Sequence, residues 1–249
     1  MLPVFVETRS LTPEVKERID KMWSELGRES LIGRRPNAAY GQSAAGKSQY
    51  EFLKAALLEM GVPTAEVREE YEIPFPGYFL PVRRWDLGVT QGKTPVALVE
   101  FKYFALLYKH KQNRASVLAN ELAFKALDLF LAMREAGIPR SSVFVGAFVQ
   151  IFRIGRPDLS KNTRKWRHPK MYAWANTQQE AIRKSLKRLV QSGLYNCVTV
   201  MEANCINYRD VRWWSLPELD LPNFLYKLEQ ACVPPDGVAE SETRRSGPD

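Results

Sequence analysis

An uncharged apolar segment at residues 143–152, VFVGAFVQIF, constrains the fold more than any other feature of this sequence. Such a run is typical of a strand in the middle of a sheet that is covered on both faces. A longer stretch at 114–136 precedes it, and there apolar residues recur at helical spacing. This order predicts a helix packed against a central strand, and therefore an α/β fold.

The remaining segments alternate between helical and strand patterns. We predict further helices at 14–26, 48–60, from 177 and at 221–232, and strands at 66–73, 86–90, 95–104 and 195–201. These elements favour one domain over residues 1–233, with a mixed central sheet flanked by helices. Residues 234–249 hold Pro, Gly, Ser and charge without periodicity, which predicts a disordered tail.

The charge of the chain suits a polyanionic partner. Its 249 residues include 36 Lys and Arg against 28 Asp and Glu, a formal net charge of +8. Seven of the cations lie within residues 151–170, beside a single acid. We interpret this stretch as a DNA-contacting loop, with a solvated run of charge as the alternative.

Composition also narrows the setting in which the protein works. Three cysteines and two histidines are too few and too scattered for a disulfide framework or a structural zinc site. No apolar run approaches the roughly 20 residues that a membrane span needs, and the first residues lack the apolar core of a signal peptide. We therefore expect a soluble, cytoplasmic protein with no membrane partner.

Charged residues occupy one end of the hairpin predicted at 86–104. Glu100 and Lys102 are two residues apart, so their side chains share one face of a strand about 7 Å apart, and Asp86 begins the neighbouring strand. Glu100 and Lys102 interrupt an apolar run, where burying charge is costly unless it has a use. The alternative is a salt bridge on an exposed strand.

This set of residue types is the one that phosphodiester hydrolysis needs. Carboxylates hold Mg²⁺, which lowers the pKa of a bound water, and a lysine stabilises the transition state. We therefore predict Asp86, Glu100 and Lys102 as catalytic residues, with the two acids as metal ligands. The order Asp, spacer, Glu-x-Lys is the PD-(D/E)xK nuclease signature.

Residues 76–87, PGYFLPVRRWDL, and 99–102, VEFK, resemble the XhoI family of type II restriction endonucleases, and the similarity extends weakly over about residues 30–232. The resemblance implies a restriction-endonuclease-like core and a homodimer that cuts double-stranded DNA at a short palindrome with Mg²⁺. It implies 5′-phosphate ends, and a cognate DNA methyltransferase in the same system without a stable complex between the two proteins.

Residues 103–112, YFALLYKHKQ, depart from the small and polar residues typical of the family after the lysine. The family's usual target, CTCGAG, is therefore not fixed by this sequence. Arg, Asn and Gln read base edges bidentately, and Lys and Arg contact phosphates. The residues that we predict to contact DNA are Arg83, Arg84, Lys109, Lys111, Gln112, Asn113, Arg114, Lys165 and Arg167.

Two further motifs each have two interpretations. Glu51 matches a family glutamate and could be another metal ligand, or it could form a capping box with Ser48. Residues 41–48, GQSAAGKS, satisfy the Walker A pattern, but the sequence shows no buried strand before them and no Walker B strand. We interpret them as a flexible loop near DNA.

Two rival functions remain open. One is a PD-(D/E)xK nuclease of DNA repair or recombination, with a different DNA substrate. The other is a basic DNA-binding protein without activity, in which the charges of the hairpin are structural.

Overall fold

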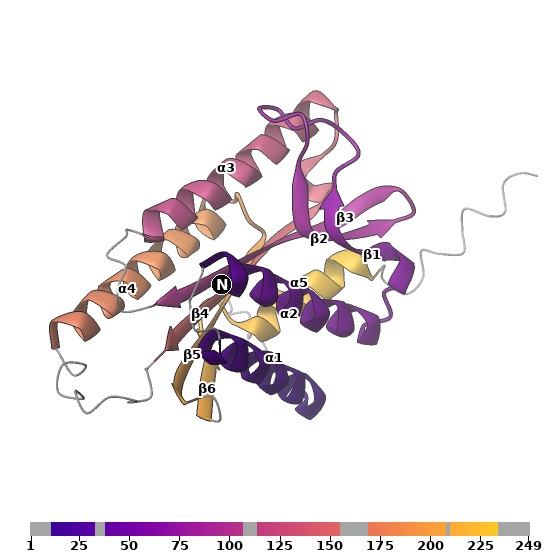
Figure 1. Ribbon diagram of the computed structural model, residues 1–249. Coiled ribbons are helices and arrows are strands. Elements are labelled where there is room, and N and C mark those ends of the chain that lie inside the picture. The colour runs from indigo at the N-terminus through magenta and orange to yellow at the C-terminus, as the bar shows by residue number, and fades with distance from the viewer. Residues whose placement is uncertain (1–10, 33–37, 107–113, 155–168, 208–209, 234–249) are drawn as a thin grey trace, which may run out of the picture.

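A mixed six-stranded sheet forms the centre of the molecule (Figure 1), with the strands in the order β1-β2-β3-β4-β5-β6. The computed structural model describes residues 11–32, 38–106, 114–154, 169–207 and 210–233. Strands β3, β4 and β5 run parallel, and the other neighbouring pairs are antiparallel. The strands are β1 Val67–Glu72, β2 Arg84–Gln91, β3 Thr94–Leu106, β4 Phe144–Ile154, β5 Cys197–Asn207 and β6 Asp210–Ser215.

Helices cover both faces of this sheet, which confirms the predicted α/β class with a mixed sheet flanked by helices. Helices α3 and α4 lie on one side, whereas α1, α2 and α5 lie on the other (Figure 1). The helices are α1 Pro13–Ile32, α2 Ala38–Glu59, α3 Arg114–Glu135, α4 Pro169–Gln191 and α5 Leu221–Cys232. Single 3₁₀ turns, Thr64–Glu66 and Arg140–Ser142, precede β1 and β4.

Strand β4 has the buried, central position that its apolar sequence predicts. Phe144 and Phe148 belong to the core beneath α1, α2 and α5, whereas Val145 and Val149 belong to the core beneath α3 and α4. Successive side chains on a strand point to opposite faces, so a strand covered on both sides needs apolar residues at every position. Gly146 leaves room for Phe224 of α5, because a Cβ atom there would come within 2.9 Å of its ring.

The structure corrects several predicted element boundaries. Helix α1 continues past Gly27 to Ile32, and α2 begins at Ala38, ten residues before the predicted start at Ser48. The Walker-like residues 41–48 therefore lie in a helix, so the predicted loop is wrong, as is a capping box at Ser48. A glycine inside a helix costs only about 1 kcal/mol, and the packing of α1 on α2 can offset that cost.

The C-terminal half differs from the sequence-based expectation at two places. Helix α4 begins at Pro169, so Thr177 is an interior residue and the predicted helix start at 177 is wrong. Proline at the first position of a helix loses no hydrogen bond, because that N–H has no partner within the helix. Strand β6, with Trp213 and Trp214, was not predicted, since its six residues carry three charged or polar side chains.

Some predictions concern residues outside the described ranges. These include most of the basic stretch at 151–170, the segment 107–113 and the tail at 234–249. The division into one domain over 1–233 stays a prediction. Within the described part of the chain, no helix combines the length and apolarity needed to cross a bilayer.

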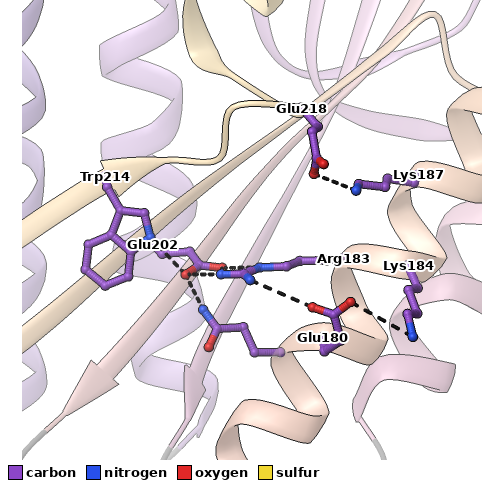
Figure 2. A network of polar contacts seen from close by, with 8 residues as sticks. Glu180, Arg183, Lys184, Lys187, Glu202, Trp214 and Glu218 are labelled. Atoms are coloured by element: carbon purple, nitrogen blue, oxygen red, sulfur yellow. Dashed lines mark hydrogen bonds and ion pairs between the residues drawn. The ribbon is translucent and has the colours of Figure 1, made fainter.

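A buried carboxylate, Glu202 of β5, attaches α4 to the sheet (Figure 2). Its side chain is only 1% exposed, and its Oε1 accepts from Arg183 Nε at 3.0 Å. Its Oε2 accepts from Arg183 at 2.9 Å, from Trp214 Nε1 at 3.1 Å and from Gln179. Every lone pair that burial removes from water is thus replaced by a donor.

Removing this carboxylate should destabilise the fold strongly. Replacing one partner of a buried ion pair leaves the other charge without compensation, and this costs about 3 to 5 kcal/mol. We expect Glu202→Ala to lower the free energy of unfolding, measured with urea, by that amount. The exposed pair between Lys187 and Glu218, at 2.5 Å, provides the control, and Glu218→Ala should cost less than about 1 kcal/mol. Equal losses of stability in Glu202→Ala and Glu218→Ala would show that Glu202 does not attach α4 to the sheet.

Candidate active site

The β2–β3 hairpin places Asp86 beside Glu100. Leu87 pairs with Val99 across the two strands, and Asp86 and Glu100 are the next residues at the open end of this ladder. The Asp86 Oδ2 atom accepts a hydrogen bond from the backbone N–H of Phe101 at 2.6 Å. This bond fixes the carboxylate against β3, next to the Glu100 side chain.

Glu100 is a buried acid that two lysines neutralise. It is 4% exposed, its Oε1 lies 2.9 Å from Lys102 Nζ, and its Oε2 contacts Lys125 Nζ. Burial by itself would raise the pKa of Glu100, but the charges of Lys125 and Lys102 outweigh this effect and lower the pKa below its ordinary value. Glu100 is therefore an anion at neutral pH.

Asp86 has the opposite perturbation. Burial and repulsion by Glu100 raise the pKa of Asp86 from 3.8 to about 6, against the lowering effects of the Phe101 N–H and the Lys125 charge. The two carboxyl groups are also close enough for a side-chain hydrogen bond between them. Two adjacent carboxylates that repel each other form a site that attracts a cation.

Lys102 completes the predicted triplet. Its Nζ contacts Glu100 at 2.9 Å and Glu121 of α3 at 3.4 Å. Burial would lower the pKa of Lys102, but the nearby charges of Glu100, Glu121 and Asp86 raise it instead. This lysine is therefore a fixed ammonium group that can stabilise negative charge, and at neutral pH it has no free electron pair with which to accept a proton.

A family model described as restriction endonuclease XhoI matches residues 31–213, well over half of the chain. The chain belongs to the XhoI restriction endonuclease family. The resemblance seen in the sequence is thereby confirmed, and the family implies a nuclease that acts on DNA. No match was found among curated proteins or among solved structures.

The match to the XhoI family contains the whole hairpin and α3, whose Lys125 was not predicted as a site residue. Lys125 Nζ contacts Glu100 and lies 4.8 Å from the ring centroid of Trp85. It follows Glu121 by four residues, so both project from one face of the helix toward the hairpin. The spacing of Glu121 and Lys125 can be seen in the sequence. It indicates the site only when α3 is known to cover the hairpin.

Two uncharged residues also support the site. The Tyr195 hydroxyl donates to the Leu122 carbonyl of α3 at 3.0 Å, and burial together with the charges of Glu100 and Asp86 raises the pKa of Tyr195 well above its ordinary value. Gln49 of α2 donates to the carbonyl of Phe148 at 3.2 Å and to that of Lys102 at 3.4 Å. Gln49 thus ties α2 to the strand that carries the lysine.

The two predicted phosphate-binding arginines differ in position. Arg83 is 7% exposed, its Nε donates to Asp128 at 2.8 Å, and its guanidinium lies over the Phe124 ring at 5.4 Å. This side chain faces inward and attaches the segment before Asp86 to α3. Arg84 is exposed and lies 3.5 Å from Glu72, so it is available at the surface.

Glu51 does not join the two acids of the hairpin. It is exposed on α2, and the described residues contain no group of three or more His, Cys, Asp or Glu side chains placed to hold a metal ion. Its role as a further ligand stays a prediction. The side chain of Arg114 is not described. Six other predicted residues lie outside the described ranges, namely Lys109, Lys111, Gln112, Asn113, Lys165 and Arg167.

The donor set at the hairpin fits a hard divalent cation. Mg²⁺ is usually bound by one or two carboxylates and keeps several waters, so Asp86 and Glu100 would suffice. Their oxygens lie close together at the edge of the core, and a cation would relieve the repulsion by Glu100 that, after burial, raises the pKa of Asp86. A softer metal would favour histidine or cysteine ligands.

The raised pKa of Asp86 predicts a cost in stability. An acid whose pKa is higher in the folded state than in the unfolded state destabilises the fold as pH rises from about 4 to 6 and above. We therefore expect Asp86→Asn to stabilise the metal-free protein at pH 7.5 by about 1 to 2 kcal/mol, allowing for partial exposure. Urea unfolding in EDTA measures this difference.

The gain should shrink as the pH falls from 6 to 4 and approach zero at about pH 3, below the ordinary pKa of 3.8, where Asp86 is protonated in both states. Glu69→Gln, at an exposed position on β1, should change stability little at either pH. A loss of stability on Asp86→Asn at pH 7.5 would contradict the assigned environment.

Proposed function

We propose that this chain is a type II restriction endonuclease that hydrolyses double-stranded DNA at a short palindrome in a Mg²⁺-dependent reaction and leaves 5′-phosphate ends. The observation that carries the proposal is the convergence of Asp86, Glu100 and Lys102 at one end of a hairpin, in a chain of the XhoI family. The basic composition of the chain agrees with a DNA substrate.

Each of the three residues has a distinct role in this proposal. Asp86 and Glu100 would hold the ion, which when bound lowers the pKa of a water and neutralises charge on the scissile phosphate. Lys102 presents an ammonium to the negative charge that develops in the transition state. Its contacts with Glu100 and Glu121 fix its position before DNA arrives, so little reorganisation is needed.

Substrate recognition is assigned to basic and amide side chains. We propose that the contacts to DNA come from Arg84, Lys109, Lys111, Gln112, Asn113, Arg114, Lys165 and Arg167. Arg83 is not among the proposed DNA contacts, because its guanidinium pairs with buried Asp128. Host DNA would be protected by a cognate methyltransferase that acts on the same sequence without binding this chain stably.

A palindromic target implies a homodimer, because a two-fold symmetric site matches a two-fold symmetric protein. An exposed apolar surface on α3 and on the segment between β1 and β2 supports this expectation. Val117 is 55% exposed, Leu127 44% and Phe79 51%, and Phe79 stacks on Phe124 at 5.5 Å. Apolar residues that gather on one surface in this way often mark a protein interface.

The catalytic assignment predicts the result of digesting a sequenced plasmid with the purified protein. We expect Mg²⁺-dependent cleavage at one fixed palindrome, loss of cleavage in EDTA, and a fall of about 100-fold or more in the cleavage rate for Asp86→Ala and Lys102→Ala. Mapping the fragment ends gives the sequence and the cut position.

Glu69→Gln should cleave as the wild type does, which controls for loss of a surface charge. Ends at many unrelated sequences would favour a repair or recombination nuclease. Unchanged cleavage in both alanine variants would refute the catalytic assignment, and DNA binding without cleavage by the wild type would favour a DNA-binding protein.

The dimer predicts a mass of two chains in light scattering after gel filtration. We expect Leu127→Glu to weaken the dimer about tenfold or more, because it places a charge in the apolar interface. Leu58→Glu is the matched control, since Leu58 is a similarly exposed leucine, 38%, on the opposite side of the sheet. If both variants remain dimeric, the second copy does not bind through α3.

A further inference from the structure

Both carboxylate oxygens of Glu100 contact lysines. Oε1 lies 2.9 Å from Lys102 Nζ, and Oε2 contacts Lys125 Nζ. Glu100 is buried, so these ammonium groups supply the compensation that water would otherwise give. A divalent ion that binds a Glu100 oxygen must either take the lone pair that now faces a lysine or lie beside an ammonium that repels it, so metal binding favours movement of one lysine.

The surroundings of the two lysines indicate which one would move. Lys102 has a second carboxylate partner, Glu121, at 3.4 Å. Both lysines act electrostatically on Asp86 and Glu100, but among the described residues the carboxylate that Lys125 contacts is Glu100. Lys102 is thus held by two carboxylates and Lys125 by one, so Lys125 is the lysine that a divalent ion at Glu100 would displace more easily.

The ring of Trp85 is a second partner for the Lys125 ammonium. The ring is fully buried, and its centroid lies 4.8 Å from Nζ, within the range of a cation–π interaction. A lysine that left Glu100 would keep this contact, so its release would cost less than moving the charge into an apolar region. The ammonium can thus leave one oxygen without leaving the site.

We propose that Lys125 is an internal counter-cation that competes with the divalent ion for Glu100, so that release of this lysine limits metal affinity in the absence of DNA. The inference rests on the proposed function, because it takes Asp86 and Glu100 as metal ligands. Lys125 is a positioning residue, because it acts on metal binding through Glu100.

The charge of the site gives this competition a role in substrate binding. Asp86, Glu100 and Glu121, when ionised, carry three negative charges against the two positive charges of Lys102 and Lys125. A divalent ion changes this small excess of negative charge into an equal excess of positive charge. The negative charge of one DNA phosphate then makes the site neutral. Metal and DNA should therefore bind better together than either does alone.

The test measures binding of Mn²⁺ alone to the full-length protein without DNA, by electron paramagnetic resonance of the free ion. We expect Lys125→Gln to bind Mn²⁺ about tenfold more tightly than the wild type, because a charge-assisted hydrogen bond no longer has to be broken. Lys54→Gln is the matched control, since Lys54 also lies over an aromatic ring, that of Tyr50 at 5.5 Å. Its affinity should equal that of the wild type.

Equal or weaker Mn²⁺ binding by Lys125→Gln would overturn the proposal and leave Lys125 as a structural ion pair. If Lys125→Gln does not fold, the fluorescence of the wild type decides. Mg²⁺ should change the Trp85 emission, and the change should vanish in Trp85→Phe and in Glu100→Gln; no change in the wild type overturns the proposal. If the wild type binds Mn²⁺ as tightly as Glu100→Gln does, the proposed metal site itself fails.

Discussion

The burial of Glu100 in the middle of an apolar sheet is the constraint on which the site depends. A carboxylate in this position must be matched by opposite charge, because an uncompensated buried ion costs several kcal/mol. Lys102 comes from the same strand, but Lys125 comes from α3, so the packing of helix on sheet is itself part of the electrostatic balance. The candidate active site and the core beneath α3 therefore depend on the same packing.

The attachment of α3 to the hairpin follows from the same requirement. Asp128, one turn after Lys125, is fully buried and pairs with Arg83, three residues before Asp86. This second ion pair holds the segment that enters β2 against the helix. Asp86 and Lys125 are thus positioned by a common scaffold, although they lie far apart in the sequence.

The parts of the site that the sequence predicted are those set by local patterns. The hairpin predicted at 86–104 and the two-residue period of a strand place Asp86, Glu100 and Lys102 together without knowledge of the rest of the fold. Lys125 could not be assigned, because its role depends on a contact between a helix and a strand that spacing does not encode. The start of α2 and the short strand β6 were missed because tertiary packing, rather than local propensity, decides them.

The buried and half-buried acids on the α3 and α4 side differ in how many donors surround them, and this difference separates structural acids from the candidate site. Glu202 and Asp128 each have an arginine partner, and such saturated groups need nothing more than the fold provides. Asp86, within the described residues, has a backbone N–H as its direct donor and faces a second carboxylate. A protein that maintains this unfavourable arrangement gains from it only if a cation completes it, which is why the hairpin, and not the larger Glu202 network, is the site where chemistry is expected.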